Sequence, residues 1–260
     1  MLGAERQQDI VSRIETDGAV EVAALSEAYG VTPDCIRKDL RALEKQGLLK
    51  RTYGGAVRVR VNRRDVDVAA RRNRNVAGKA AIAARALELI QPGATIFLDI
   101  STSNAELARL LDQSGRPATV VTNMLDVATV LGSPGALHVI VVGGAFNSSH
   151  DGFVGSLTDE QIRRFRFDAA FMGAAGLDTG RGTALTYLPE DGLTKAAALS
   201  VSRTAYLLTE TRKLTEDGDY SYASLDEFTG IILDGQPPAA EKARLEEFGL
   251  TVLLSDDTKK

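Results

Sequence analysis

The sequence has one cysteine, two histidines and no long apolar run, and each scarcity excludes a class of protein. A single cysteine, Cys35, excludes an intramolecular disulfide bond and a cysteine-based zinc cluster. Two histidines leave too few ligands for a histidine-rich metal site. No apolar stretch approaches the roughly 20 residues that a membrane helix requires, and the first residues lack the apolar segment of a signal peptide. We therefore expect a cytoplasmic protein that contacts no membrane and holds no metal or cofactor.

Charge is distributed unevenly along the 260 residues, although 44% hydrophobic and 25% charged residues are an ordinary globular balance for one or two domains. Residues 1–80 hold 16 Lys and Arg against 11 Asp and Glu, whereas residues 81–260 hold 15 against 24. Within residues 36–64, ten basic residues stand against two acidic ones. This asymmetry predicts that only the N-terminal part meets a polyanion. A solvated charged surface is the alternative.

The first 57 residues have the pattern of a winged helix-turn-helix domain. Residues 4–16 and 22–29 are predicted helices, ended by Gly18 and Gly30. Thr32 is a suitable N-cap for a third helix, which Pro33 would begin and Gly47 would end. Residues 48–49 and 56–57 then predict two short strands, turned at residues 54–55, that form the wing.

The predicted third helix separates an apolar face from a basic face. At about 100° per residue, Ile36, Leu40 and Leu43 share the face that packs on the other helices. Asp39 lies near that face and is interpreted as the structural partner of a polar group. The opposite face would reach base edges in a major groove, and the wing would contact phosphates, which provide affinity rather than sequence choice. The candidate DNA-binding residues are Thr32, Asp34, Cys35, Arg37, Lys38, Arg41, Lys50, Arg51 and Arg58. A helical protein–protein module with a solvated charged face is the alternative for this domain.

Residues 58–75 are predicted to be a charged linker or an exposed connecting helix, and residues 76–260 an α/β domain. Strand-like runs lie at 95–99, 118–122, 138–142, 168–173, 205–209, 230–233 and 251–254. Predicted helices lie between several of them, at 79–91, 104–112, 124–131, 156–165, 189–202 and 238–248. This alternation predicts βα units and a mainly parallel sheet with both faces covered.

Polar residues collect where the predicted strands end, which is where ligands bind in open parallel sheets. Hydroxyls follow the first strand at a helix N-terminus, an arrangement that favours phosphate, and two lysines follow later strands. A flexible loop is predicted over residues 173–182, after the fourth strand. The candidate effector-binding residues are Asp99, Ser101, Thr102, Ser103, Asn104, Thr122, Asn123, Gly143, Gly144, Asp191, Lys195 and Lys213. Helix caps, tight turns and surface charge are the structural alternatives for these residues taken singly.

Residues 5–56 resemble the DNA-binding domain of the DeoR family of bacterial transcription regulators, through the run Thr32-Pro33-Asp34-Cys35-Ile36-Arg37-Lys38-Asp39-Leu40 and the Gly-Gly wing. The strand ends are similar to the sensor domain of the same family. Its pattern D-x-G-T-T corresponds to residues 99–103, its T-N pair to residues 122–123 and its G-G pair to residues 143–144. Its pattern E-x-x-T-K corresponds to residues 191–195, and its pattern D-x-S-K to residues 210–213. Ser101 replaces a glycine of the family pattern, and Arg212 replaces a serine.

The resemblance implies a winged helix-turn-helix domain joined to a Rossmann-like sensor domain that is similar to ribose-5-phosphate isomerase. It further implies a repressor of a sugar or carbohydrate operon, which binds double-stranded operator DNA as a dimer or tetramer under the control of a phosphorylated sugar. We expect no enzymatic activity. An activator is one alternative. The other is a sugar-phosphate isomerase-like enzyme fused to a DNA-binding domain, with Asp99 or Asp191 as base and Lys195 as electrostatic helper.

The DNA-binding hypothesis predicts different outcomes for the third helix and the wing. Arg37→Ala removes a base contact, so it should cost about 1–3 kcal/mol of binding free energy and relax the preference at one operator position. Arg58→Ala removes a phosphate contact, so it should weaken binding to all sequences alike and reduce the salt dependence. Operator titrations at several salt concentrations measure both. Small, uniform effects from both substitutions would favour the protein–protein module.

Overall fold

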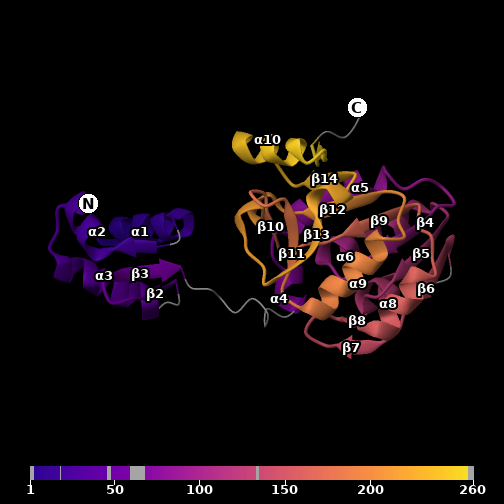
Figure 1. Ribbon diagram of the computed structural model, residues 1–260, viewed down its shortest axis with the longest axis horizontal. Coiled ribbons are helices and arrows are strands. Elements are labelled where there is room, and N and C mark those ends of the chain that lie inside the picture. Colours follow the sequence, from indigo (N-terminus) through magenta and orange to yellow (C-terminus); the bar gives the residue numbers. More distant parts are fainter. Residues whose placement is uncertain (1–2, 18, 46–47, 59–67, 133–134, 257–260) are drawn as a thin grey trace. The chain divides into compact units, whose positions relative to one another are not determined.

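The computed structural model describes residues 3–17, 19–45, 48–58, 68–132 and 135–256 (Figure 1). The chain divides into two compact units, an N-terminal unit of residues 1–63 and a C-terminal unit of residues 64–260. Each unit is described by itself below.

The N-terminal unit combines three helices with a small antiparallel sheet. Its elements are α1 (Gly3–Asp17), β1 (Ala19–Glu21), α2 (Val22–Tyr29), α3 (Pro33–Lys45), β2 (Leu49–Arg51) and β3 (Gly55–Arg58), with strand order β1-β3-β2. The three predicted helices and the two wing strands are confirmed, whereas Gly18 and Gly47 lie outside the described residues. Strand β1 was not predicted. It pairs with β3 so closely that a Cβ at Gly55 would lie 1.9 Å from the Val20 carbonyl oxygen.

The predicted inner face of α3 is confirmed. Ile36, Leu40 and Leu43 are buried with Ile10 and Ile14 of α1 in one apolar cluster. Asp39 is also buried, and it holds α3 to α1 because its carboxylate accepts hydrogen bonds from Arg6 Nε at 2.7 Å and Gln7 Nε2 at 2.9 Å. The structural role predicted for Asp39 is therefore confirmed.

A seven-stranded parallel sheet forms the centre of the C-terminal unit (Figure 1). Its order is β15-β14-β12-β9-β4-β5-β6. The strands are β4 (Thr95–Leu98), β5 (Ala118–Thr122), β6 (Leu137–Val141), β9 (Ala169–Met172), β12 (Ala205–Thr209), β14 (Gly230–Leu233) and β15 (Thr251–Leu254), one for each predicted strand. The chain turns from β4 toward β5 and β6 on one side, and later elements add β9 and β12 on the other. The strand order therefore reverses between β4 and β9.

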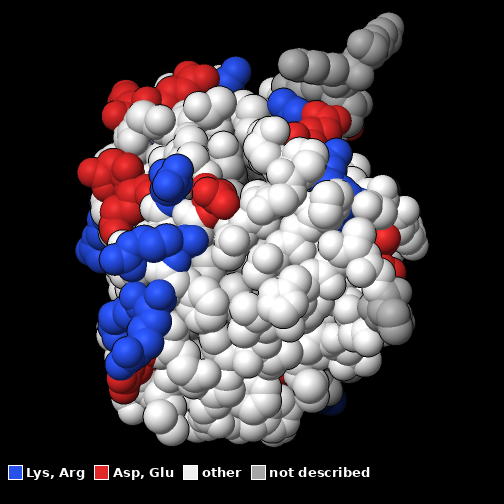
Figure 2. Space-filling view, turned by 90° about the vertical axis from the view of Figure 1, so that its right-hand side faces the viewer, with Lys and Arg blue, Asp and Glu red and all other residues white. Residues whose placement is uncertain are grey.

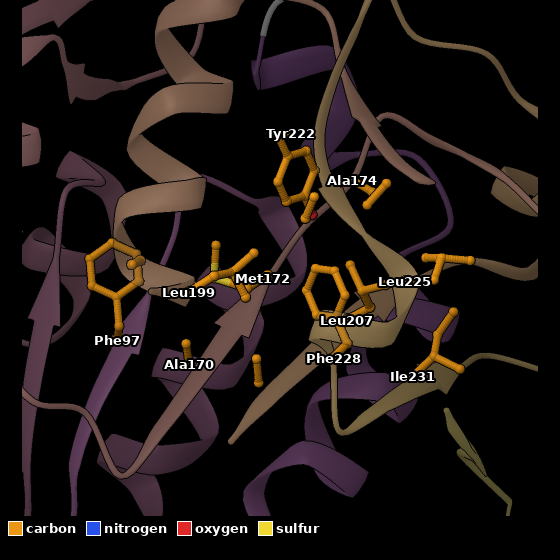
Figure 3. Packing of buried hydrophobic residues seen from close by; sticks show 14 of the residues in the cluster. Phe97, Ala170, Met172, Ala174, Leu199, Leu207, Tyr222, Leu225, Phe228 and Ile231 are labelled. Atoms are coloured by element: carbon orange, nitrogen blue, oxygen red, sulfur yellow. The ribbon is translucent and has the colours of Figure 1, made fainter. Parts of the chain in front are cut away.

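Helices cover both faces of this sheet, as the alternating pattern predicted. They are α5 (Val76–Leu87), α6 (Thr102–Ser114), α7 (Leu125–Val130), α8 (Ser156–Arg163), α9 (Pro189–Leu199) and α10 (Ala239–Glu247). Ile96 and Leu98 of β4 pack in a cluster with α5, α6 and α7. Phe97, between them, points to the opposite face and packs with α8 and α9 (Figure 3). Fully buried strands of this kind produce continuous apolar runs, which is why the sequence pattern located them.

The antiparallel pieces of the C-terminal unit were not predicted. They are the hairpin of β7 (Ala145–Asn147) and β8 (Gly152–Val154), and a small sheet of β10 (Gly176–Asp178), β11 (Thr183–Thr186) and β13 (Tyr220–Ser224). The prediction of a flexible loop over residues 173–182 is therefore wrong. Strand β10 lies within it, and the turn toward β11 is closed by a hydrogen bond from Arg181 N to Asp178 Oδ1 at 2.9 Å.

A short helix, α4 (Val68–Arg72), lies in the segment that the sequence assigned to the linker. Its Val68 is buried in the cluster of α5 and α6. Lys79 of α5 is also buried, and its ammonium donates to the carbonyl oxygens of Arg71 and Arg74 at the end of α4. The first part of the predicted linker, residues 59–67, lies outside the described residues. The domain boundaries at residues 57 and 75 stay a prediction.

Two searches of the described residues found nothing. No described helix has both the length and the apolar character to span a bilayer. No group of three or more His, Cys, Asp or Glu residues in the described part of the chain has metal-binding geometry.

The packing of α4 predicts where the C-terminal unit can be cut. A fragment of residues 64–260 should fold alone, and a fragment of residues 76–260 should melt at a lower temperature. The shorter fragment lacks Val68, whose burial stabilises the fold by about 1.5–3 kcal/mol. It also lacks the carbonyl oxygens that accept hydrogen bonds from Lys79. Thermal unfolding followed by circular dichroism measures both, with Val68→Ala in the longer fragment as the control. Equal melting temperatures would contradict this role for α4, and an unfolded longer fragment would contradict the independence of the unit.

Candidate functional site

The outer face of α3 and the wing present the predicted DNA contacts. Thr32 caps α3, since its carbonyl oxygen accepts from Cys35 N at 3.0 Å and its hydroxyl lies 3.4 Å from the same N–H. The other exposed members of the predicted set are Asp34, Arg37, Lys38, Arg41, Lys50 and Arg51. Arg58 lies in β3, but its side chain is outside the described residues. The structure thus gathers exposed basic side chains on one helix and the adjoining strands.

Four members of this set have protein partners. Arg37 Nη1 pairs with Asp34 Oδ1 at 2.6 Å on the surface, where such pairs contribute little stability and are readily exchanged for another anion. Arg51 pairs with Glu44 at 2.6 Å. Cys35 Sγ lies 3.3 Å from Arg6 Nη2, so its thiol turns toward α1 and away from the outer face.

A second polar site lies at the carboxyl ends of β4 and β9, where the strand order of the parallel sheet reverses. Asp99 follows β4 and is buried, as are Asp191 and Lys195 of α9. The Lys195 ammonium forms an ion pair with Asp99 Oδ2, and it lies 3.4 Å from Asp191 Oδ1. Ligands of open parallel sheets bind at this kind of position.

Further hydrogen bonds fix both carboxylates of this cluster. Asp99 accepts from Gly173 N at 2.9 Å and from Asn104 Nδ2 at 2.6 Å. Asp191 accepts from the Thr186 hydroxyl at 2.5 Å. The cluster therefore joins the ends of β4, β9 and β11 to α6 and α9.

Burial and charge act against each other at these groups. Burial raises the pKa of Asp99, and the Lys195 ammonium opposes that shift only in part. Burial disfavours the ammonium of Lys195, but Asp191 and Asp99 outweigh it and raise the pKa of Lys195. Lys195 is therefore held as a cation between two carboxylates.

Sequence analysis missed two residues that face this cluster. Tyr222 of β13 is buried, with the Lys195 ammonium 5.9 Å from its ring centre, and its hydroxyl donates to the Gly173 carbonyl oxygen at 2.9 Å. His150 is buried in the turn between β7 and β8, where burial, followed by the charge of Arg71, lowers its pKa. His150 lies in a hairpin turn and Tyr222 in a small antiparallel sheet, and no periodic pattern revealed either.

Lys213 lies in the short 3₁₀ helix η2 (Thr211–Thr215) after β12. Its ammonium donates to the carbonyl oxygen of Ala174, beyond β9, at 2.7 Å. Burial lowers its pKa from the ordinary 10.5 to about 8, although Glu210 and Glu216 favour the charged form. Those two carboxylates pair with Arg212 instead, at 2.7 Å and 2.6 Å. Lys213 is thus a half-buried lysine whose charge is poorly compensated.

The remaining predicted residues surround these groups but are engaged in structural contacts. The Ser101 hydroxyl caps α6 by accepting from Asn104 N at 3.1 Å, while Thr102 and Ser103 lie in the first turn of that helix. The Thr122 hydroxyl donates to Leu98 O at 2.7 Å. Asn123 Nδ2 donates to Phe153 O at 2.8 Å.

The glycine pair after β6 approaches α8. A Cβ at Gly144 would lie 2.0 Å from the Thr158 hydroxyl oxygen, and the Gly143 carbonyl oxygen accepts from that hydroxyl at 2.9 Å. The absent side chain at Gly144 thus accommodates the protein's own helix.

Several buried polar atoms around the strand ends have no hydrogen-bond partner among the described residues. They are Asn104 Oδ1, Asn123 Oδ1 and Thr209 Oγ1, which follow or end β4, β5 and β12. Buried polar atoms normally have partners, so this end of the sheet is suited to a polar ligand. A shallow pocket at the opposite end, near Ala94 and Ala169, has one lining carboxylate, Asp168. Its Oδ2 already accepts from Thr95 N at 3.0 Å.

Both units match family models of known proteins. Residues 6–61 match the DeoR-like helix-turn-helix domain, and residues 74–235 match the DeoR C terminal sensor domain. A ribose 5-phosphate isomerase A from Methanocaldococcus jannaschii is 12% identical with a TM-score of 0.37, over 51% of this chain and 52% of that one. That similarity is too low to carry an argument, and the fold class rests on the parallel sheet itself.

Curated relatives match along nearly the whole chain. The "Putative aga operon transcriptional repressor" of Escherichia coli O157:H7 is 30% identical over 96% of this chain and 93% of that protein. The "HTH-type transcriptional regulator GlpR" of Haloferax volcanii is 32% identical over 97% and 98%. The "Glycerol-3-phosphate regulon repressor" of Escherichia coli K12 is 30% identical over 92% and 94%. With both domains matched in order and a basic helix-turn-helix surface in place, the chain belongs to the DeoR family of DNA-binding transcription regulators.

Proposed function

We propose that the chain is a repressor whose binding to operator DNA is controlled by a phosphorylated sugar or a related metabolite. The observation that carries the proposal is Lys213, a half-buried lysine that donates to a carbonyl oxygen beside the Asp99–Lys195–Asp191 cluster. A phosphate provides the negative charge that Lys213 lacks. The names of relatives, among them repressors of the aga operon and of the glycerol-3-phosphate regulon, support the same conclusion.

Different polar groups of the site are suited to the phosphate and to the sugar of such a ligand. Lys213 and the first turn of α6, with Ser101, Thr102 and Ser103, are suited to the phosphate, because helix N-termini attract anions. Asp99 and Asp191 are acceptors for sugar hydroxyls. The unpartnered oxygens of Asn104 and Asn123 add further acceptors for those hydroxyls.

The first residues of the C-terminal unit after α4 offer a route by which this site can affect the DNA-binding helix. Arg72 of α4 pairs with Asp126 at 3.0 Å and with Asp151 at 3.1 Å, next to His150. Asn75 Nδ2 donates to Glu210 at 2.9 Å and to Asp234 at 2.7 Å. Both ends of residues 72–75 are therefore held by loops that border the site. A ligand that moves these loops changes how the chain leaves α4 toward the N-terminal unit. The ligand shifts the free energy of DNA binding by the difference between its binding free energies for the two arrangements of the chain.

We further propose that the chain is not an isomerase. A general base needs a carboxylate that is free to accept a proton from the substrate. Asp99 is engaged by Lys195, Gly173 and Asn104, and Asp191 by Lys195 and Thr186. Incubation with several pentose and hexose phosphates should leave each one unchanged, and turnover of any of them would contradict this proposal.

Lys213→Met should abolish the effect of the ligand on DNA binding, because the side chain keeps its bulk but loses the cation. A thermal-shift screen of sugar phosphates identifies the ligand, and operator titrations with and without it measure the effect. In the wild type, a coupling free energy of about 1–3 kcal/mol between ligand binding and DNA binding corresponds to a 5–150-fold change in operator affinity. Lys242→Met is the matched control, because Lys242 is an exposed lysine of α10. A wild-type response in Lys213→Met would place the site elsewhere.

Ligand affinity should fall as the pH rises from 7 to 9.5. Free Lys213 loses its proton near pH 8, whereas a bound phosphate favours the ammonium, so above pH 8 binding must take up a proton. The affinity should then fall by up to about tenfold per pH unit. Calorimetric titrations over this range measure it, since the phosphate keeps its charge there. A wild-type affinity that is independent of pH, or the same slope in Lys213→Met, would contradict this role of Lys213.

A further inference from the structure

One long segment of the chain is almost without charge. Residues 127–158 contain a single charged residue, Asp151, although 25% of all residues are charged. Asp151 is itself neutralised by Arg72, at 3.1 Å. The segment includes β6, the β7–β8 hairpin and residues 156–158 at the start of α8.

Burial does not explain this lack of charge, because the segment is at the surface. Val141 at the end of β6 is 43% exposed, Phe146 of β7 49% and Leu157 of α8 67%. Phe146 is paired with Phe153 across the hairpin, with ring centres 5.4 Å apart. Large apolar side chains therefore face the solvent in a segment whose one charged residue is paired with Arg72.

These elements lie together on one side of the C-terminal unit. Strand β6 is the last strand of the large sheet, the β7–β8 hairpin follows it directly, and α8 follows the hairpin. Figure 2 shows the side on which β6 and α8 lie in Figure 1. Charged side chains gather along one edge and at the top of this view, and a broad area between is free of them. We call the surface formed by β6, the hairpin and residues 156–158 at the start of α8 the uncharged face.

We propose that two copies of the chain associate through the uncharged face. In a two-fold interface each copy presents the same patch to the other. A patch with charges of one sign would repel the same patch on the second copy, whereas an uncharged apolar patch can pack against it. DNA and anionic metabolites do not fit this surface, because it offers no basic side chain. A helix-turn-helix regulator needs a second copy to occupy a two-fold operator.

The edge strand β6 supports a second copy as the occupant. In the described residues it pairs with β5 alone, and its sequence Leu-His-Val-Ile-Val contains no proline or charged residue. Natural sheets protect exposed edges with such residues. An edge strand without proline or charged residues is suited to being covered permanently by another chain. A symmetric partner covers it by placing its own β6 alongside. This proposal rests on the DNA-binding family and not on the identity of the effector.

Charge placed on the uncharged face tests the proposal directly. Val141→Glu and Phe146→Glu should each weaken self-association at least tenfold, measured on the full chain by sedimentation equilibrium. Thr251→Glu is the matched control, because Thr251 is an exposed position of β15, the opposite edge strand of the same sheet. It should associate as the wild type does. Circular dichroism confirms that each variant is folded.

Three results would overturn the proposal. The first is a wild-type chain that is monomeric at tens of micromolar. The second is that folded Val141→Glu and Phe146→Glu variants associate as the wild type does. The third is that Thr251→Glu weakens self-association as much as they do. If both glutamate variants fail to fold, cross-linking decides. With Cys35 replaced by serine, Ala145→Cys should be joined to its copy by a short bis-maleimide and Thr251→Cys should not. The absence of covalent dimers from Ala145→Cys would then overturn it.

Discussion

The buried ion cluster of Lys195, Asp99 and Asp191 is the interaction on which the proposed sensor site depends. It connects the end of β4 to α9 at the point where the strand order reverses. Removing one partner of such a buried pair costs about 3–5 kcal/mol, because the other charge is left uncompensated. Replacing the whole pair with apolar residues is often neutral, so stability alone does not require a cluster here. Its position at the ligand-binding end of the sheet favours a functional role.

The same cluster explains how a small ligand would affect distant DNA. The β7–β8 hairpin carries His150 beside the site and Asp151, which pairs with Arg72 of α4. That hairpin also belongs to the uncharged face. Ligand site, α4 and proposed interface therefore share one element, and a shift of the hairpin would change all three together. In a dimer it would alter both copies at once, which is what a regulator of a two-fold operator requires.

Much of the fold followed from local patterns. The five inner strands of the main sheet are largely buried on both faces, and continuous apolar runs locate such strands well. Asp191 and Lys195 are four positions apart, a spacing that places both on one face of a helix, and Lys195 Nζ lies 3.4 Å from Asp191 Oδ1. The ion pair of Lys195 with Asp99 joins residues that are 96 positions apart, and spacing contains no information about such a contact. His150 and Tyr222 escaped prediction for the same reason, because a hairpin turn and a short antiparallel strand place them. Gly144 resembled a ligand-binding turn, and only the fold reveals that it accommodates Thr158 of α8.

Operator titration of Lys195→Ala, with and without the best phosphorylated ligand, tests the central claim most directly. The account predicts that ligand-free affinity for the operator stays within about twofold of wild type, because the N-terminal unit is untouched. The ligand-induced change, about 5–150-fold in the wild type, should disappear. Circular dichroism and thermal unfolding show whether the variant remains folded despite its two unpaired carboxylates. If it does and still responds to the ligand as the wild type does, the cluster at the carboxyl ends of β4 and β9 is not the sensor site.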